Sequence, residues 1–328
     1  MPRVGMNTSR HQVTDYHPAR VTIAMLTNIP NFTGYFSHRF DVLRLSLESL
    51  IANTHLPYDL LVFDNGSCPE VVNYLQELND AEKIHYLLLS SRNIGKIGAF
   101  QIMFNAAPGE IVAYSDDDIL FCPGWLEAHL EIIDTYPRVG MVTGIYLRTQ
   151  VVEGLTSVNA FLSQPGVEVV RGRLIHEEWE HDYVVDSGRE WDQYIAETAN
   201  LEDIQIKYKG VTCLATAHHA QFVSPRQAIL EALPDEWSGR LMGKMREVDL
   251  AVDRLGYLRL STNQRVTQLM GNLIGDPIAS KARSMGLGSF SVARVNFQSS
   301  LVQRIYRNPL IHRLAQGLYN RLYWIINA

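Results

Sequence analysis

Three consecutive aspartates, Asp116, Asp117 and Asp118, stand between two short apolar runs of the sequence. Carboxylates this close repel one another, and burying them is costly unless water or a cation neutralises their charge. In an extended backbone, Asp116 and Asp118 point to one side and Asp117 points to the other. Two carboxylates on one side are typical of a Mg²⁺ or Mn²⁺ site that keeps open positions for water and for the phosphate oxygens of a ligand. The alternative is an acidic turn that caps the helix expected from residue 124 onward.

Two further polar segments are candidates for a ligand site. Residues 63–67 include Asp64, whose carboxylate either satisfies backbone N–H groups at a helix start or accepts hydrogen bonds from the edge of a nucleotide base. Residues 91–99 include Asn93 and Gly95 and open a predicted helix, so small residues there would let a ligand approach the backbone N–H groups. This segment lacks the full Walker pattern and the dinucleotide fingerprint, and such a loop also has an ordinary structural explanation.

The helix predicted at residues 242–255 is amphipathic from Arg246 onward, and it carries Glu247 and Asp249. Acidic side chains near a helix N-terminus interact favourably with the helix dipole and with basic side chains one turn further on. Taken alone, this helix would be interpreted as one whose charged side chains simply face solvent.

The first half of the chain alternates predicted strands with amphipathic helices, which is typical of an α/β fold with a largely parallel sheet. In open α/β sheets, ligands bind outside the carboxyl ends of the strands. Asp64, Asn93 and the aspartate triplet each follow a predicted strand, so we expect them at equivalent ends of the sheet. The strands are expected at residues 21–26, 58–63, 84–89, 111–115 and 139–143, and the helices at 37–53, 69–78, 97–106 and 124–135.

Beyond residue 148 the alternation is looser, and we expect this region to shape an acceptor pocket. Aromatic side chains here either stack on sugar faces or, as is commoner, pack in the core. They are Trp179, Tyr183, Trp191, Tyr194 and Trp237. Strands are expected at residues 167–170, 183–186, 211–217 and 257–261, and helices at 225–233 and 242–255.

The order of four motifs along the chain resembles the family 2 glycosyltransferases of the GT-A fold. The motifs lie at residues 63–67, 92–95, 115–118 and 247–257. The resemblance covers about residues 21–270 and is strongest in the first half. It implies a GT-A nucleotide-diphospho-sugar transferase fold, in which helices flank a mostly parallel central sheet. The implied parts are an N-terminal tail at 1–19, a nucleotide-sugar-binding half at 20–148, an acceptor-binding and catalytic-base half at 149–275, and a C-terminal helical extension at 276–328.

The resemblance also implies how a donor sugar nucleotide is held. Breaking the sugar–phosphate bond develops negative charge on the departing nucleoside diphosphate, and a cation that bridges the diphosphate stabilises that charge. The implied roles are contact with the nucleotide base for Asp64, a place beside the nucleotide for Asn93 and Gly95, binding of Mn²⁺ or Mg²⁺ and the donor for Asp116 and Asp118, and a helper role in donor binding for Asp117.

The base that the resemblance implies is Glu247, which would remove the proton of the attacking hydroxyl while the anomeric configuration inverts. Two positions depart from the family pattern. Arg246 stands where the family has an acidic residue, and Gln268 stands where many relatives have a histidine that binds the metal or phosphate. His218 or His219 would supply the missing nitrogen, although one packed histidine and one in a polar pocket is the simpler interpretation.

The composition limits the class and location of the protein. Of 328 residues, 46% are hydrophobic and 20% are charged, which is typical of a globular chain. A net charge of -6 gives no broad attraction for nucleic acid. The three cysteines show no paired spacing, residues 1–19 contain no signal-peptide core, and no charge-free run has the length of a membrane span. We therefore expect a cytoplasmic protein.

Residues 296–328 combine Arg with Leu, Ile, Tyr and Trp at near-helical spacing. A helix docked on the domain or in a homodimer has this pattern, and so has a helix that lies peripherally on the inner face of a membrane. The other expected partners are a nucleotide-diphosphate sugar donor and a glycan, lipid-linked or small-molecule acceptor.

Two alternatives to a transferase are open at this point. One is a non-catalytic protein that binds nucleotide sugars, which the residues at positions 246 and 268 suggest. The other is a sugar-nucleotide pyrophosphorylase, a class that usually has a glycine- and arginine-rich loop after the first strand. Residues 27–31 of this chain, Thr-Asn-Ile-Pro-Asn, do not have that composition.

Overall fold

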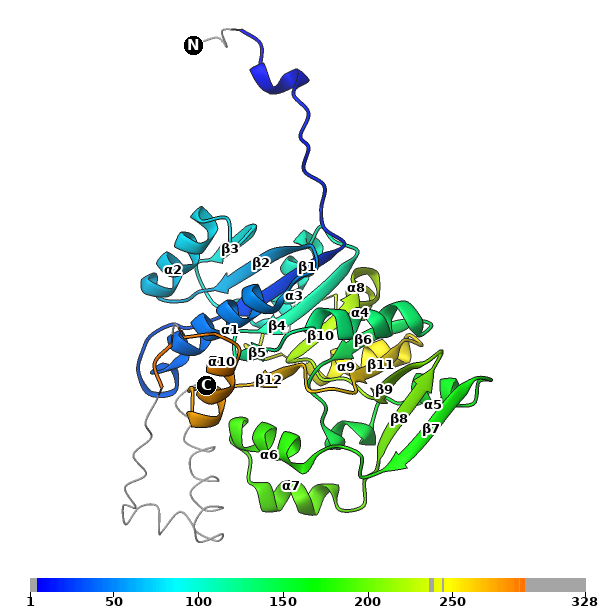
Figure 1. Ribbon diagram of the computed structural model, residues 1–328. Coiled ribbons are helices and arrows are strands. Elements are labelled where there is room, and N and C mark those ends of the chain that lie inside the picture. The colour runs from blue at the N-terminus through cyan, green and yellow to red at the C-terminus, as the bar shows by residue number, and fades with distance from the viewer. Residues whose placement is uncertain (1–4, 236–238, 244, 289, 293–328) are drawn as a thin grey trace, which may run out of the picture. The chain divides into compact units, whose positions relative to one another are not determined.

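The computed structural model describes residues 5–235, 239–243, 245–288 and 290–292. Its main feature is a ten-stranded mixed sheet in the order β3-β2-β1-β4-β10-β6-β11-β9-β8-β7 (Figure 1). Met1–Val292 is one compact unit that contains the whole sheet. Of the predicted C-terminal extension, α10 (Asp276–Ser284) is described, whereas residues 293–328 lie outside the described residues.

Four neighbouring strands form the parallel half of the sheet. β1 pairs in parallel with β2 and with β4, and β2 pairs in parallel with β3. Because both faces of these strands are covered, their sequences are nearly unbroken apolar runs rather than alternating ones. The elements of this half are β1 (Val21–Thr27), α1 (Arg39–Asn53), β2 (Tyr58–Asn65), α2 (Pro69–Asp80), β3 (Tyr86–Ser90), α3 (Lys96–Ala106) and β4 (Ile111–Asp116).

The other half begins at β10, which runs antiparallel between β4 and β6. β11 is parallel to β6, and the outer strands β9, β8 and β7 are antiparallel. Followed through these pairings, seven of the ten strands of this sheet run in one direction, so the predicted α/β fold with a mostly parallel sheet is confirmed. These strands are β6 (Val139–Thr143), β7 (Val167–Gly172), β8 (Asp203–Tyr208), β9 (Val211–Ala215), β10 (Gln221–Pro225) and β11 (Leu258–Thr262).

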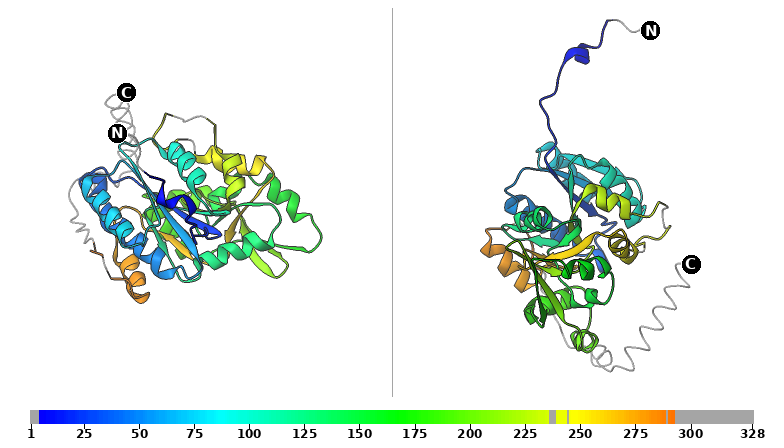
Figure 2. Two further views of the ribbon diagram at one scale, coloured as in Figure 1. Left: turned by 90° about the horizontal axis from the view of Figure 1, so that it is seen from above. Right: turned by 90° about the vertical axis from the view of Figure 1, so that its right-hand side faces the viewer.

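Helices cover both faces of the sheet (Figure 2). On one face, Ile23 and Met25 of β1 pack in a core with side chains of α1, α2 and α4. On the other face, Ala24 packs in a second core with side chains of α3, α8 and α9. The alternation of β1 side chains between the two cores follows from the two-residue period of a strand. The remaining helices have the bounds α4 (Trp125–Thr135), α5 (Thr156–Leu162), α6 (Glu177–Asp186), α7 (Trp191–Thr198), α8 (Arg226–Ala232) and α9 (Met245–Arg254).

Two predictions about local structure are wrong. Residues 183–186, predicted as a strand, are the last turn of α6, whose first turn carries Glu177, Glu178 and Glu180. The alternative that the aspartate triplet caps a helix also fails, because β5 (Ile119–Phe121) follows the triplet directly and pairs with β12 (Thr267–Leu269). The helix α4 begins only at Trp125, after Gly124.

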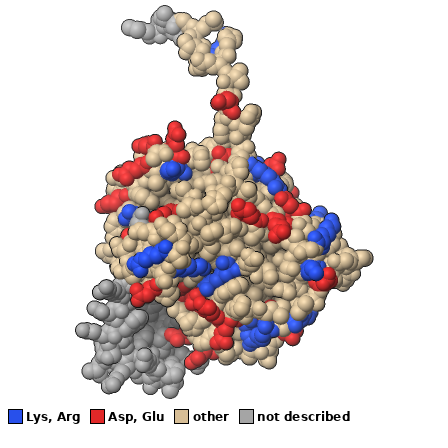
Figure 3. All heavy atoms as spheres, in the orientation of Figure 1, with Lys and Arg blue, Asp and Glu red and all other residues tan. Residues whose placement is uncertain are grey.

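Neither the described helices nor the surface shown in Figure 3 has a feature that points to a membrane or polyanion partner. None of the helices in the described part of the chain has the length and apolar character needed to cross a membrane. On the face shown in Figure 3, acidic and basic side chains are interspersed, and no single-sign field covers it.

Candidate active site

The aspartate triplet lies at the carboxyl edge of the sheet, which is the edge where β1, β2 and β4 end. Asp116 is the last residue of β4 and lies opposite Leu26 of β1. The backbone N–H of Asp116 donates to the carbonyl of Ala220, the residue before β10, over 2.9 Å. The carbonyl of Asp118 accepts from the N–H of Met270 over 2.8 Å. Neighbours far apart in the sequence therefore fix the triplet on both sides.

Arg39, the first residue of α1, neutralises two of the three aspartates. Its Nη1 lies 2.8 Å from Asp118 Oδ2 and 3.0 Å from the carbonyl of Gly271, and its Nη2 donates to Asp117. Asp117 also accepts a 2.6 Å hydrogen bond from Thr27 Oγ1, at the end of β1. Arg39 is 7% exposed, so this ion pair is strongly desolvated. A guanidinium thus supplies part of the positive charge that the sequence assigned to a metal ion.

Lys96, the first residue of α3, neutralises the third aspartate. Its Nζ lies 2.6 and 2.8 Å from the two carboxylate oxygens of Asp116, and Tyr114 donates its hydroxyl to the same carboxylate. Neither Arg39 nor Lys96 is predicted as a site residue from the sequence. The one signal for Arg39 was a basic residue in the first turn of a helix, where the helix dipole favours acidic residues.

Three carboxylates face two cationic side chains, so one negative charge is left at the triplet. Burial raises the pKa of Asp117 to about 6 although Arg39 opposes it, and burial also raises the pKa of Asp118. Among the described residues, Asp118 Oδ1 is a buried oxygen with no hydrogen-bond partner. An unpaired buried carboxylate oxygen is costly, so this atom is suited to bind a cation or a donor group of a ligand.

Asp64 holds its own turn at the end of β2. Its carboxylate accepts hydrogen bonds from the backbone N–H groups of Gly66 at 3.3 Å and Ser67 at 3.2 Å, and it is 1% exposed. Burial raises the pKa of Asp64, whereas the bonds from Ser67 and Gly66 lower it. This geometry matches the turn interpretation of Asp64; contact with a nucleotide base would require the carboxylate to turn outward.

Asn93 ties together the loops that follow β1, β2 and β3. Its carboxamide accepts from Asn65 Nδ2 and donates to Asn28 Oδ1, both at 3.0 Å, and it accepts from the N–H of Gly95 at 2.8 Å. Gly95 has φ 79°, and a Cβ there would lie 2.7 Å from the carbonyl oxygen of Arg240. The Asn93 loop therefore packs directly on the segment that precedes α9.

The predicted base, Glu247, lies in the first turn of α9 and is exposed. The same helix buries Asp249, which is 2% exposed and lies 2.8 Å from His219 Nδ1 through its Oδ2. The rings of His219 and His218 stack at 4.5 Å. His218 has its pKa lowered well below the usual value, first by burial and then by His219 and Lys96. Lys96 thus lies near both the histidine pair and the triplet.

Gln268, expected in place of a histidine ligand, has another partner. Its Oε1 accepts a 3.0 Å hydrogen bond from Lys281 of α10, and the side chain is 6% exposed. Gln268 is part of β12, whose end is joined to the triplet through Met270 and Asp118. It therefore supports the site through backbone pairing, with its side-chain oxygen already bonded.

The aromatic residues of the second half divide between packing and lining a cavity. Tyr194 is buried and donates to Glu180, which with Asp203 binds the buried Arg148. Trp191 stacks on Tyr194 at 5.7 Å. Trp179 and Tyr183 line a small cavity of about 30 Å³, and the Tyr183 ring meets His218 edge-on at 5.8 Å. Trp237 lies outside the described residues.

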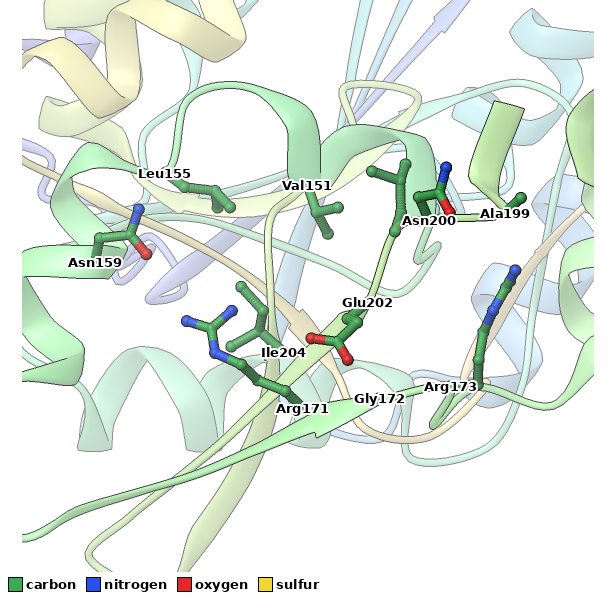
Figure 4. A pocket seen from close by; sticks show the side chains of 11 residues that line it. Val151, Leu155, Asn159, Arg171, Gly172, Arg173, Ala199, Asn200, Glu202 and Ile204 are labelled. Carbon is green, nitrogen blue, oxygen red and sulfur yellow. The ribbon is translucent and has the colours of Figure 1, made fainter. Parts of the chain in front are cut away.

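A larger open cleft of about 580 Å³ lies between the α5 region, β7 and the segment before β8 (Figure 4). Its lining includes Arg171 of β7, Arg173 just after β7, and Glu202 just before β8. None of the site residues predicted from the sequence belongs to its lining.

A segment in the first part of the chain is similar to a known protein family. Residues 35–182 match the family model described as glycosyl transferase family 2. A relative in Nostoc sp. (strain PCC 7120), named uncharacterized glycosyltransferase alr2836, is 27% identical over 120 residues. The match covers 37% of this chain and 35% of that protein, so the chain spans about a third of the length of the relative.

Solved structures show weaker likeness. TarS 1-349 of S. aureus matches with a TM-score of 0.44 at 10% identity, over 76% of this chain and 59% of TarS 1-349. The mannosyltransferase PcManGT of Pyrobaculum calidifontis, in complex with GDP-Man and Mn²⁺, matches with a TM-score of 0.31 at 20% identity, over 39% of this chain and 35% of PcManGT. At these scores, neither structure assigns a ligand to this chain. Residues 35–182, which carry Arg39, the Asn93 loop and the aspartate triplet, are thus similar to glycosyl transferase family 2, the family that the sequence motifs resemble.

Proposed function

We propose that the protein is an inverting glycosyltransferase that moves a sugar from a nucleotide-diphosphate sugar to an acceptor hydroxyl. The observation that carries this proposal is the position of the aspartate triplet: it lies inside the family 2 match and at the carboxyl edge of the sheet, where ligands of α/β folds bind. Lys96 and Arg39 lie at the same edge and provide positive charge for a diphosphate.

One unpaired carboxylate oxygen at the triplet is suited to bind a divalent cation. Asp118 Oδ1 is a buried oxygen without a partner, whereas both oxygens of Asp116 accept from Lys96. No group of three or more His, Cys, Asp or Glu side chains suited to a metal occurs in the described part of the chain, so donor phosphate and water would complete the coordination. We assign Asp118 as the main ligand of Mn²⁺ or Mg²⁺, with Asp116 joining if Lys96 turns to the diphosphate. When bound, the ion would offset the charge of the leaving group.

The group transfer conserves atoms and charge. The acceptor oxygen forms a bond to the anomeric carbon, the bond from that carbon to the phosphate oxygen breaks, and the nucleoside diphosphate leaves with the electron pair. The acceptor proton goes to a base, for which the resemblance implies Glu247. Asp64, Asn93, Gly95 and Asp117 keep their proposed roles around the nucleotide, with Asn93 and Asp64 also shaping the loops that would hold it.

A thermal-shift panel tests donor binding. The full chain is heated with UDP, GDP and their common sugars, each with and without Mn²⁺, because a ligand that binds only the folded state raises the melting temperature. We expect stabilisation by at least one nucleotide sugar, larger with Mn²⁺, and loss of the Mn²⁺ increment in Asp118→Asn. Asp80→Asn, an exposed carboxylate at the end of α2, is the matched control. Absence of any shift across the panel would contradict the proposal.

A non-catalytic nucleotide-sugar-binding protein is the second candidate, and the exposed position of Glu247 beside Arg246 is the observation that favours it. Slow donor hydrolysis discriminates, because a binder would show affinity without release of nucleoside diphosphate. A pyrophosphorylase is the weaker alternative, since residues 27–31 after the first strand are not rich in glycine and arginine. The cytoplasmic location and the homodimer or membrane contact of the C-terminal stretch stay predictions.

A further inference from the structure

A carboxylate–histidine pair, His219 and Asp249, lies beside the acidic triplet and has no role assigned so far. Asp249 Oδ2 lies 2.8 Å from His219 Nδ1. Because a carboxylate only accepts hydrogen bonds, Nδ1 carries the proton in the neutral ring and Nε2 carries the lone pair. No hydrogen bond of Nε2 is found among the described residues, and the His219 side chain is 23% exposed. The pair therefore presents an oriented, accessible proton acceptor.

The pair belongs to the same edge of the sheet as the triplet. β10 runs antiparallel to β4 with Gln221 opposite Ser115, and Ala220 accepts the backbone N–H of Asp116. His219 precedes Ala220, so it lies one strand away from the aspartates. Lys96, which binds Asp116, is also close enough to His218 to lower its pKa. Asp249 reaches this place from α9, on the second-half side of the site.

Two features near His219 are energetically unfavourable in the folded protein. Thr216 has φ 81°, a left-handed conformation that is strained for a β-branched residue. Its backbone is fixed there by the carbonyl of Arg259 at 2.8 Å and by the Ser261 hydroxyl at 2.6 Å. In addition, Asp249 Oδ1 is buried and has no hydrogen-bond partner among the described residues. Strain and an unpaired carboxylate oxygen in one place are typical of a functional site rather than of simple packing.

We infer that His219, oriented by Asp249, is the base that accepts the proton of the attacking hydroxyl, in the role that the resemblance gave to Glu247. The inference rests on the proposed transferase function. His219 Nε2 takes the proton as the acceptor oxygen bonds to the anomeric carbon, and the imidazolium that forms is stabilised by Asp249. Asp249 is a positioning residue, because it acts through the ring. Among the described residues, Arg259, 4.0 Å from Asp249, and His218, stacked on His219, are charged or titratable groups against the pair.

The experiment measures release of nucleoside diphosphate from UDP- and GDP-sugars by the full-length chain, with Mn²⁺ and with water as the acceptor. His219→Ala is compared with the wild type and with His55→Ala, a matched control at an exposed histidine after α1. We expect the rate of His219→Ala to fall about 10²-fold or more, as is typical of removing a general base. The variant should keep its donor-induced thermal shift. Its rate should no longer fall at acidic pH as the wild-type rate does. Added imidazole should restore part of the rate.

Asp249→Asn separates orientation from folding. An asparagine that donates to Nδ1 places the ring proton on Nε2, so we expect a lower rate with donor binding retained. If the wild type releases no nucleoside diphosphate, the proposed function and this inference fail together. If the wild type is active and His219→Ala keeps the rate and the pH profile, or is not rescued by imidazole, the inference alone is overturned. Loss of all turnover in Glu247→Gln with full activity in His219→Ala would return the role to Glu247.

Discussion

Lys96 Nζ lies 2.6 and 2.8 Å from the two carboxylate oxygens of Asp116. In the proposed metal site, an ion bound at Asp116 would have to displace this ammonium. Replacing Lys96 with Met should free Asp116, so we expect Mn²⁺ alone to raise the melting temperature of Lys96→Met more than that of the wild type. Without Mn²⁺ the variant should lose about 1–3 kcal/mol of stability, because a mostly buried carboxylate has lost its partner. An equal Mn²⁺ shift in both proteins would show that Asp116 does not bind the ion.

Arg39 joins Asp117, Asp118 and the carbonyl of Gly271, all in buried surroundings. Removing one partner of a buried ion pair typically costs about 3–5 kcal/mol. We expect a loss of this size in the free energy of unfolding of Arg39→Leu, measured by urea denaturation. Arg44→Leu in the next turn of α1, where the side chain is 39% exposed, should change stability far less. Similar losses in the two variants would contradict the assigned role of Arg39.

Gly95 combines a positive φ with close packing, and Gly124 has a similar φ of 77° with nothing within 4 Å of its Cβ position. Both Gly→Ala variants should therefore lose about 1–2 kcal/mol from backbone strain. Gly95→Ala should lose more, because its Cβ would lie 2.7 Å from the Arg240 carbonyl. Donor binding should weaken in Gly95→Ala only, as read by the thermal shift. Equal effects in both variants would show that the contact with the segment before α9 has no consequence.

Asp186, at the end of α6, should make the stability depend on pH. Burial raises its pKa to about 7, with a further rise from Asp182, so the folded protein binds a proton that the unfolded chain releases between about pH 4 and 7. This contribution stabilises the fold below pH 4 and is lost as the pH rises through 7. His129, whose pKa burial lowers to about 4, has the opposite effect, so the difference between wild type and variant is the useful quantity.

We therefore expect the stability of Asp186→Asn relative to the wild type to rise as the pH increases from 4 to 7.5, measured by urea denaturation at each pH. A constant difference over this range would mean that Asp186 titrates normally.

The sequence was informative where local pattern decides structure. The apolar run before Asp116 predicted β4, and the placement of the triplet at its carboxyl end followed from that. Arg39 and Lys96 could not be predicted as its partners, because they come from helices whose approach depends on the packing of the whole sheet. Nor does the sequence indicate that His219 and Asp249 meet, since β10 inserts antiparallel between β4 and β6.

The missed and wrong elements have physical causes. β10, Gln221–Pro225, is short and contains Gln, Ser and Pro, so its sequence resembles a loop, although its pairing with β4 makes it a central strand. The Val184-Val185 pair favoured a strand, but Val184 is buried as part of α6. Tertiary packing overrides β propensity at this position.

The most direct test of the central claim, a cation held at Asp118 for a departing nucleoside diphosphate, is the rate of nucleoside diphosphate release with Mn²⁺ and with EDTA, for the wild type and Asp118→Asn. We expect the wild type to release product from at least one UDP- or GDP-sugar only when the metal is present, and the folded variant to release none. Release by Asp118→Asn at the wild-type rate, or wild-type release that EDTA leaves unchanged, would contradict the claim.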